Sequence, residues 1–124
     1  MKEKKTILII DDDTDNNLLM SRIIGFMKEE PVFMLTGDKA INWISMHQPD
    51  LILCDISLPD ISGIELVKTL RGIEKIAHLP VIAVSAHDYH EDIESAKNAG
   101  FTDYLVKPFM PNDLVNMIKK YLYE

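Results

Sequence analysis

The sequence ILIIDDD, at residues 7–13, joins four aliphatic residues to three consecutive aspartates. The aliphatic part lacks the alternation of apolar and polar residues that marks a half-exposed strand, so both of its faces should be covered. Strands covered on both faces are typical of parallel sheets that carry helices on each side. The stretch therefore predicts a buried parallel strand that ends in an acidic turn.

Four further short apolar runs are predicted to form strands. They lie at residues 32–35, 51–54, 81–84 and 104–106. Between the runs, apolar residues recur at helical spacing, as Leu19, Ile23 and Met27 do. The segment at residues 88–99 has the sparsest apolar stripe, and Gly100 is suited to end it as a helix.

The alternation of strand and helix defines the expected fold class. Strand and helix alternate five times, which predicts an α/β fold, a (βα)5 doubly wound parallel five-stranded sheet. A chain this short favours the flavodoxin-like strand order 2-1-3-4-5. In that order, ligands bind beyond the carboxyl ends of the first and third strands.

The composition and charge restrict the class of protein. The 124 residues fit a single domain, because one hydrophobic core commonly organises roughly 100 to 150 residues. The net charge of −7 disfavours direct binding to nucleic acid. The single cysteine, Cys54, cannot form an internal disulfide, and no apolar run is long enough for a signal peptide. We therefore expect a cytoplasmic protein without direct nucleic-acid or membrane contact.

Carboxylates follow the first and third predicted strands. Residues 11–13 are aspartates at the end of the first strand, and Asp55 follows the third, so at least three carboxylates should meet in one crevice. Two carboxylates about 4 Å apart repel by roughly 4 kcal/mol at an effective dielectric constant near 20. A cation is therefore expected, and oxygen ligands favour Mg²⁺ over zinc. The acidic run by itself could also form a solvated turn or a helix cap.

A hydroxyl and an amine follow the fourth and fifth predicted strands. Ser85 follows the fourth strand, and Lys107 follows the fifth, just before Pro108. Together with the carboxylates, these groups could hold a metal ion and a phosphoryl group. Each has an ordinary alternative, because Lys107 could be an exposed surface lysine and Ser85 a turn residue. The functional interpretation is favoured because all the partners that it requires are present.

Taken in order along the chain, these motifs resemble the motif set of response regulator receiver domains. They are Asp11-Asp12-Asp13; Cys54-Asp55-Ile56-Ser57-Leu58-Pro59 with Gly63; Ser85-Ala86; and Tyr104-Leu105-Val106-Lys107-Pro108-Phe109. The combined match implies a single receiver domain with its core at about residues 6–122, nearly the whole chain. The match is highly specific, whereas each piece alone is weak. The resemblance implies phosphorelay signal transduction, in which the chain accepts a phosphoryl group from a phosphohistidine and then switches its binding to a partner.

The resemblance also implies roles for individual residues at the crevice. Asp55 would be the nucleophile that forms an aspartyl phosphate. Asp12 would ligate Mg²⁺ directly and Asp11 through water, while Asp55 and the backbone carbonyl of Ser57 would complete the protein ligands. Lys107 would pair with a phosphoryl oxygen.

Further residues are expected, by the same resemblance, to switch the signal or to set its duration. The Ser85 hydroxyl would bind another phosphoryl oxygen after an inward movement of its loop, and Tyr104 would swing inward with it. Tyr104 could instead be a half-buried surface tyrosine. His87 and Ser57 would govern the lifetime of the phosphoryl group. Pro108, expected to be cis, would turn the preceding lysine into the crevice.

The resemblance implies partners for both steps of signalling. The donor would be a histidine kinase or a histidine-phosphotransfer protein that docks at Asn16, Asn17, Leu18 and the loop at Phe109. Output would pass to a separate protein through the fourth helix and the strand and helix after it. The chain could stand alone or come from a hybrid sensor kinase. It would catalyse its own phosphorylation and dephosphorylation without being a conventional turnover enzyme.

Other classes of protein fit the sequence less well. A haloacid-dehalogenase-type phosphatase would require Thr or Val where Asp15 stands, and a calcium loop would require Gly where Asn16 stands. A flavodoxin-like electron carrier would need a loop that binds cofactor phosphate, which the acidic residues would repel. The alternative that remains open is a receiver-fold interaction module that binds partners without phosphate.

Overall fold

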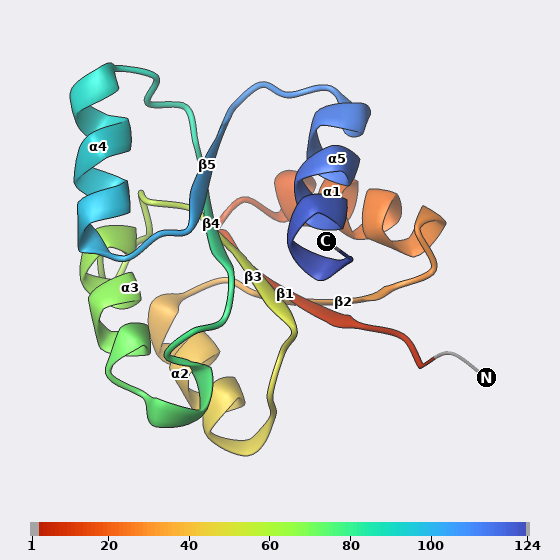
Figure 1. The fold of residues 1–124 in the computed structure, drawn as a ribbon, viewed down its shortest axis with the longest axis horizontal. Helices are drawn as coiled ribbons and strands as arrows, with labels where there is room; N and C mark the ends of the chain where they lie inside the picture. The colour runs from red at the N-terminus through yellow and green to blue at the C-terminus, as the bar shows by residue number, and fades with distance from the viewer. Residues whose placement is uncertain (1–2, 124) are drawn as a thin grey trace.

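The computed structural model describes residues 3–123, which form a five-stranded parallel sheet with helices on both faces (Figure 1). The strands are β1 (Thr6–Ile10), β2 (Glu30–Met34), β3 (Leu51–Cys54), β4 (Val81–Ser85) and β5 (Asp103–Val106). Their order in the sheet is β2-β1-β3-β4-β5. The predicted α/β class and the predicted strand order are therefore confirmed.

Helices connect the strands and cover both faces of the sheet. They are α1 (Thr14–Phe26), α2 (Gly37–Met46), α3 (Gly63–Arg71), the short 3-10 helix η1 (Glu74–Ile76), α4 (His90–Ala99) and α5 (Pro111–Leu122). In Figure 1, α1 and α5 lie on one face, and α2, α3 and α4 lie on the other. None of the helices between residues 3 and 123 has the length and apolar composition needed to cross a membrane.

Successive residues of β1 enter different cores. Leu8 and Ile10 pack among residues of α2, α3 and α4, whereas Ile7 and Ile9 pack among residues of α1 and α5. All four side chains are fully buried. The absence of polar alternation in this run therefore reflects burial on both faces of the sheet.

The second strand differs from its prediction. The apolar run at residues 32–35 predicts a strand there, but β2 begins at Glu30 and ends at Met34. β2 lies at the edge of the sheet, and an edge strand tolerates Pro31, which has no N–H to donate. Pairing with β1, rather than apolar composition, therefore sets its limits.

The predicted apolar stripe of the first helix is partly wrong. Leu19 is 47% exposed, whereas its neighbour Met20 is buried, together with Ile23 and Ile24. The buried face of α1 is thus rotated by one residue from the expected one. The sparse fourth segment does form a helix, and Gly100 ends it with a φ of 130°, a conformation that side chains with a Cβ rarely adopt.

The loop between β3 and α3 is anchored at two places. The Gly63 N–H donates to the carbonyl oxygen of Ile56 at 2.7 Å. The Asp60 carboxylate accepts hydrogen bonds from the N–H groups of Gly37 at 3.0 Å and Asp38 at 2.9 Å, at the beginning of α2. These backbone donors, that of Asp38 first, hold the pKa of Asp60 below its ordinary value. The chain that follows Asp55 is therefore fixed against two helices.

Candidate functional site

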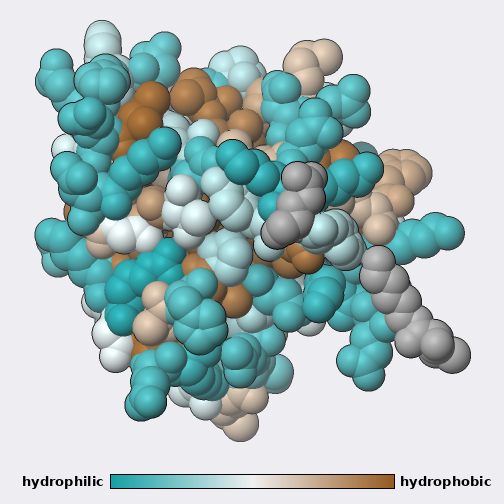
Figure 2. All heavy atoms as spheres, in the orientation of Figure 1, coloured by the Kyte–Doolittle hydropathy of each residue, from teal (hydrophilic) through white to brown (hydrophobic). Residues whose placement is uncertain are grey.

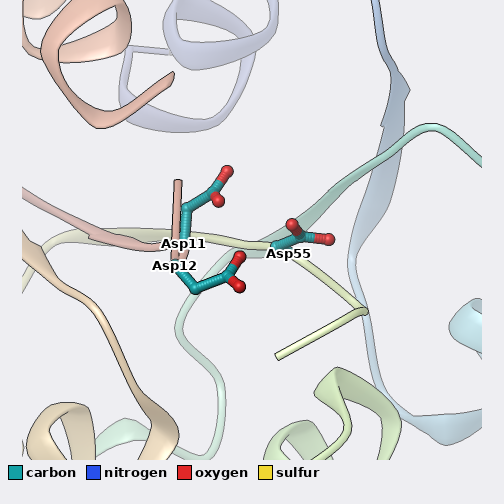
Figure 3. Close-up of side chains that lie close together, drawn as sticks. All are labelled: Asp11, Asp12 and Asp55. Atoms are coloured by element: carbon teal, nitrogen blue, oxygen red, sulfur yellow. The ribbon is translucent and has the colours of Figure 1, made fainter. Parts of the chain in front are cut away.

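Asp11, Asp12 and Asp55 lie together at the carboxyl edge of the sheet, with their carboxylates gathered in one place (Figure 3). One oxygen from each of the three lies within 4.8 Å of the others. Asp11 follows β1 and Asp55 follows β3, and these strands are paired at Ile10 and Cys54. Asp11 and Asp55 are buried, whereas Asp12 is exposed. Three oxygen ligands at this spacing can hold a hard divalent cation such as Mg²⁺.

Lys107 reaches the same carboxylates from the end of β5. Its Nζ lies 2.9 Å from Asp11 Oδ2 and 3.3 Å from Asp55 Oδ2. The peptide bond between Lys107 and Pro108 is cis, and the Lys107 N–H donates to the carbonyl oxygen of Ser85 at 2.8 Å. Burial alone would lower the pKa of Lys107, but the two carboxylates outweigh this effect and raise the pKa. The lysine is therefore charged at neutral pH.

Opposing effects act on the pKa of Asp55. Burial is the largest of them and raises this pKa above its ordinary value. The Ser57 N–H, which donates to Asp55 Oδ1 at 3.0 Å, and Lys107 act in the opposite direction, while Asp11 adds repulsion. The charged form of Asp55 is thus only partly compensated. A further cation beside it would stabilise that form.

Gly63 allows α3 to begin directly against the loop that carries Asp55. A Cβ at this position would lie 2.6 Å from the carbonyl oxygen of Asp55 and 2.6 Å from the Cα of Ile56. Both are backbone atoms, so a side chain here would displace the loop itself. The glycine of the sequence motif is therefore required by close backbone approach.

Asp13 differs in role from the two aspartates that precede it. Its carboxylate accepts a hydrogen bond from the Asp15 N–H at 2.9 Å and caps α1. The helix-cap alternative for the acidic run thus describes Asp13. The Asp13 N–H in turn donates to Asp11 Oδ1 at 2.9 Å, which helps to orient Asp11 within the cluster.

Asn17 is a buried residue of α1, and its predicted place on a docking surface is wrong. Its Nδ2 donates to the backbone carbonyl of Asp11 at 2.8 Å, and its side chain is fully buried. Asn16, by contrast, is partly exposed. Two adjacent asparagines give no sequence signal of which one faces the protein, so this supporting contact beneath Asp11 could not be found from the sequence.

Ser85 at the end of β4, His87 in the loop after it and Tyr104 in β5 form a connected group. The Ser85 Oγ accepts a hydrogen bond from the His87 N–H at 3.2 Å. The Tyr104 hydroxyl donates to the carbonyl oxygen of His87 at 2.6 Å. Tyr104 is 8% exposed, and burial raises the pKa of its hydroxyl. The tyrosine is therefore turned into the protein, against the loop that begins at Ser85.

A groove of about 320 Å³ lies next to Lys107. It is lined by Asn16, Leu19, Ala86, Lys107, Pro108 and Phe109. Leu19, whose exposure contradicts its predicted place in the core, forms part of this wall. The groove therefore joins the beginning of α1 to the loop before α5.

Comparisons with known proteins agree with this geometry. A profile described as the response regulator receiver domain matches residues 7–119. The polar-differentiation response regulator DivK of Brucella ovis is 36% identical over 118 residues, which cover 95% of this chain and 96% of DivK. A CheY-like receiver domain protein from Methanospirillum hungatei has a TM-score of 0.88 at 32% identity, covering 97% of this chain and 94% of that one.

A more distant structure shares the fold. The receiver domain of a sensor histidine kinase from Pseudomonas aeruginosa has a TM-score of 0.90 at 24% identity, over 98% of this chain and 100% of that one. Its active-site cleft coordinates a magnesium ion. At this identity the likeness concerns the fold. With the family match over nearly the whole chain and the relatives above 30% identity, the protein belongs to the response regulator receiver domains and acts in phosphorelay signal transduction.

Proposed function

We propose that the chain accepts a phosphoryl group on Asp55, and that the aspartyl phosphate changes its binding to a separate output protein. The observation that carries this proposal is the gathering of Asp11, Asp12 and Asp55 within 4.8 Å, with Lys107 Nζ 3.3 Å from Asp55 Oδ2. A carboxylate nucleophile flanked by a lysine and by oxygen ligands for a divalent cation is suited to phosphoryl transfer.

The phosphoryl donor is a phosphohistidine on a histidine kinase or on a histidine-phosphotransfer protein. An oxygen of Asp55 forms the bond to phosphorus while the bond between phosphorus and the imidazole nitrogen breaks, and the electron pair of the broken bond stays on that nitrogen. The groove next to Lys107, with Leu19 and Phe109 among its lining residues, offers the donor an apolar contact beside the acceptor.

Mg²⁺ is part of the proposal, and the donor set fits it because every ligand is an oxygen. Asp12 would bind the ion directly and Asp11 through water, and Asp55 and the backbone carbonyl of Ser57 would complete the protein ligands. When bound, the ion would supply positive charge beside the carboxylates and the phosphoryl oxygens. Lys107, already 2.9 Å from Asp11 Oδ2, holds a further phosphoryl oxygen.

Ser85 and Tyr104 form the switch. The Ser85 hydroxyl binds another phosphoryl oxygen, which draws the loop after β4 toward Asp55. Because His87 contacts both Ser85 Oγ and the Tyr104 hydroxyl, this movement changes the surroundings of the tyrosine. Tyr104 thereby passes the change to the surface of α4, β5 and α5. Ser57 and His87 set the lifetime of the phosphoryl group by controlling access of water to it.

The proposed unit is a single receiver domain over residues 1–124, with its core at about residues 6–122, that works in the cytoplasm. It catalyses its own phosphorylation and dephosphorylation. Its output passes to another protein rather than to DNA, because a net charge of −7 opposes contact with a phosphate backbone.

Intact-protein mass spectrometry after incubation with acetyl phosphate and MgCl2 tests the proposal. The wild-type protein is expected to gain one phosphoryl group, and the gain should be absent in Asp55→Asn and absent when EDTA is present. Asp13→Asn is the matched control, because Asn retains the helix cap and should leave the gain intact. If no donor produces a gain, the chain is a receiver-fold interaction module that binds partners without phosphate.

A further inference from the structure

A groove of about 440 Å³ lies between α1 and α5, the two helices that cover one face of the sheet (Figure 1). The residues that line it on the α1 side are Ile23, Phe26 and Met27. It shares no lining residue with the groove next to Lys107, so it is separate from the proposed donor site. We call it the α1–α5 groove.

The α5 side of the α1–α5 groove is a regular row. It consists of Pro111, Val115 and Lys119, which recur every four residues and therefore lie on one side of the helix, and of Tyr123, which caps its end. At about 1.5 Å of rise per residue, the row spans roughly 18 Å. That is the length of a helix of about three turns, laid along the groove.

Phe26 gives the α1–α5 groove an exposed aromatic side chain. Phe26 is 87% exposed, whereas large apolar side chains are usually well covered. In Figure 2, apolar atoms appear in several separate places on a mostly hydrophilic face, some of them beside α5 and α1. Aromatic anchors beside apolar grooves are typical of surfaces that bind an amphipathic helix.

The residues that line the α1–α5 groove carry a charge opposite in sign to that of the whole chain. Lys119 lines the groove, and none of its described lining residues is acidic. Arg22 lies one turn before Phe26 on α1, Lys28 follows it, and both are exposed. Beside Met27 and Tyr123, Lys4 and Lys28 are accompanied by Glu3 and Glu29, so the cationic excess rests on Lys119 and Arg22. The chain as a whole carries a net charge of −7, so this excess is a local feature. A second copy of the chain would bring the same cations to the contact.

We propose that the α1–α5 groove binds an amphipathic helix of about three turns from another protein. The apolar side of that helix covers Phe26 and the row on α5, and carboxylates along its edge pair with Lys119 and Arg22. Apolar burial supplies affinity, and the charges select an acidic partner. This binding uses neither Asp55 nor the acidic crevice and does not depend on the proposed phosphorylation.

A display library of three-turn helices tests the proposal. Each member carries a fixed apolar stripe, and the flanking positions hold Glu, Gln or Lys at random. Selection on the wild-type protein is expected to enrich Glu at these positions, and selection on Lys119→Glu should move the preference toward Lys. A selected helix should bind Phe26→Ser at least about tenfold more weakly in fluorescence anisotropy, the loss typical of a central aromatic anchor.

Met46→Ser is the matched control, because Met46 is 82% exposed but lies on α2, on the opposite face of the sheet. It should bind the selected helix as tightly as the wild type does. Enrichment without a charge preference, or selected helices that bind Phe26→Ser as well as wild type, would overturn the proposal. Sedimentation equilibrium gives a separate outcome: a dimer that is lost in Phe26→Ser would assign the groove to a second copy of the chain.

Discussion

Two partly buried cations, Lys107 and Arg71, are held in different ways. Lys107 Nζ contacts two carboxylates, those of Asp11 and Asp55, which are themselves crowded together. The Arg71 guanidinium contacts neutral acceptors. It donates to the carbonyl oxygens of Gly100 at 2.9 Å, Leu79 at 2.6 Å and Ala77 at 3.1 Å, and to the Thr102 hydroxyl at 3.1 Å.

This difference in partners indicates that the contacts of Arg71 are structural, whereas those of Lys107 belong to a reactive site. Arg71 ties the end of α3 to the segment before β4 and to the end of α4, and its partners have no further charge to satisfy. Burial lowers its pKa, but a guanidinium stays charged. At the other site, the charge of Lys107 compensates the charges of Asp11 and Asp55 only in part, and burial raises the pKa of Asp55. A reactive site is expected to lower the stability of the fold, and contacts such as those of Arg71 are expected to offset this loss.

The largest effect on stability is expected from Arg71→Ala. The change leaves three backbone carbonyls without their donor, while the Thr102 hydroxyl keeps the Val81 N–H, and it should lower the free energy of unfolding by about 3 kcal/mol. Urea unfolding measures this loss. Arg71→Lys should lose most of the same amount, because an ammonium group cannot reproduce the planar set of donors. If Arg71→Ala lowers the free energy of unfolding by less than about 1 kcal/mol, the contacts of Arg71 do not have the structural role assigned to them.

Gly63→Ala should affect both the stability of the fold and the reactive site. The added Cβ would meet backbone atoms of Asp55 and Ile56 at 2.6 Å, so we expect a loss of about 2 kcal/mol together with slower phosphoryl uptake. Gly25→Ala is the matched control, because no atom lies within 4 Å of a Cβ there and alanine favours the helix by roughly 0.5 to 1 kcal/mol. Equal stability of the two variants in urea would show that the loop can yield.

Asp55→Asn should raise the free energy of unfolding when Mg²⁺ is absent. Burial and the neighbouring Asp11 both disfavour the charged carboxylate, and asparagine has nearly the same shape without the charge. Adding MgCl2 should stabilise the wild type and have less effect on Asp55→Asn, since the ion binds the folded state. Thermal unfolding with and without MgCl2 provides the measurement. If Asp55→Asn is less stable than the wild type without Mg²⁺, the negative charge of Asp55 is already compensated by its neighbours.

The smallest effect is expected at Asp103, a partly buried carboxylate with many partners. Burial alone would raise its pKa, but the Tyr121 hydroxyl, the Tyr104 N–H and Lys120 outweigh this and lower it. A lowered pKa means that Asp103 contributes stability above its unfolded pKa of about 4 and loses it as the pH falls through the folded value.

Asp103→Asn should therefore cost about 1 kcal/mol or less at pH 7 and reduce the loss of stability during acid titration. Urea unfolding at several pH values between 7 and 3 follows both effects. Tyr121→Phe, which keeps the carboxylate and removes the hydrogen bond at 2.5 Å, should give part of the same change. Identical pH dependence in wild type and Asp103→Asn would contradict the assignment.

The features of the fold that depend on local composition could be predicted from the sequence. The run at residues 51–54 coincides with β3, and the aspartates after two predicted strands meet as expected because parallel strands end at one edge. The limits of β2 were not predictable, since pairing at the sheet edge decides them. The contacts of Arg71 could not be predicted either, because three of its acceptors are backbone carbonyls and one lies 29 residues away.

The central claim is that Asp55 accepts phosphorus beside a divalent cation, and a crystal structure with MgCl2 and beryllium fluoride tests it most directly. We predict a beryllofluoride group on Asp55 and Lys107 Nζ within hydrogen-bonding distance of a fluorine. The metal ion should be held directly by Asp12, Asp55 and the Ser57 carbonyl, and through water by Asp11. An acidic crevice that stays empty, or a lysine that points into bulk solvent, would contradict the account.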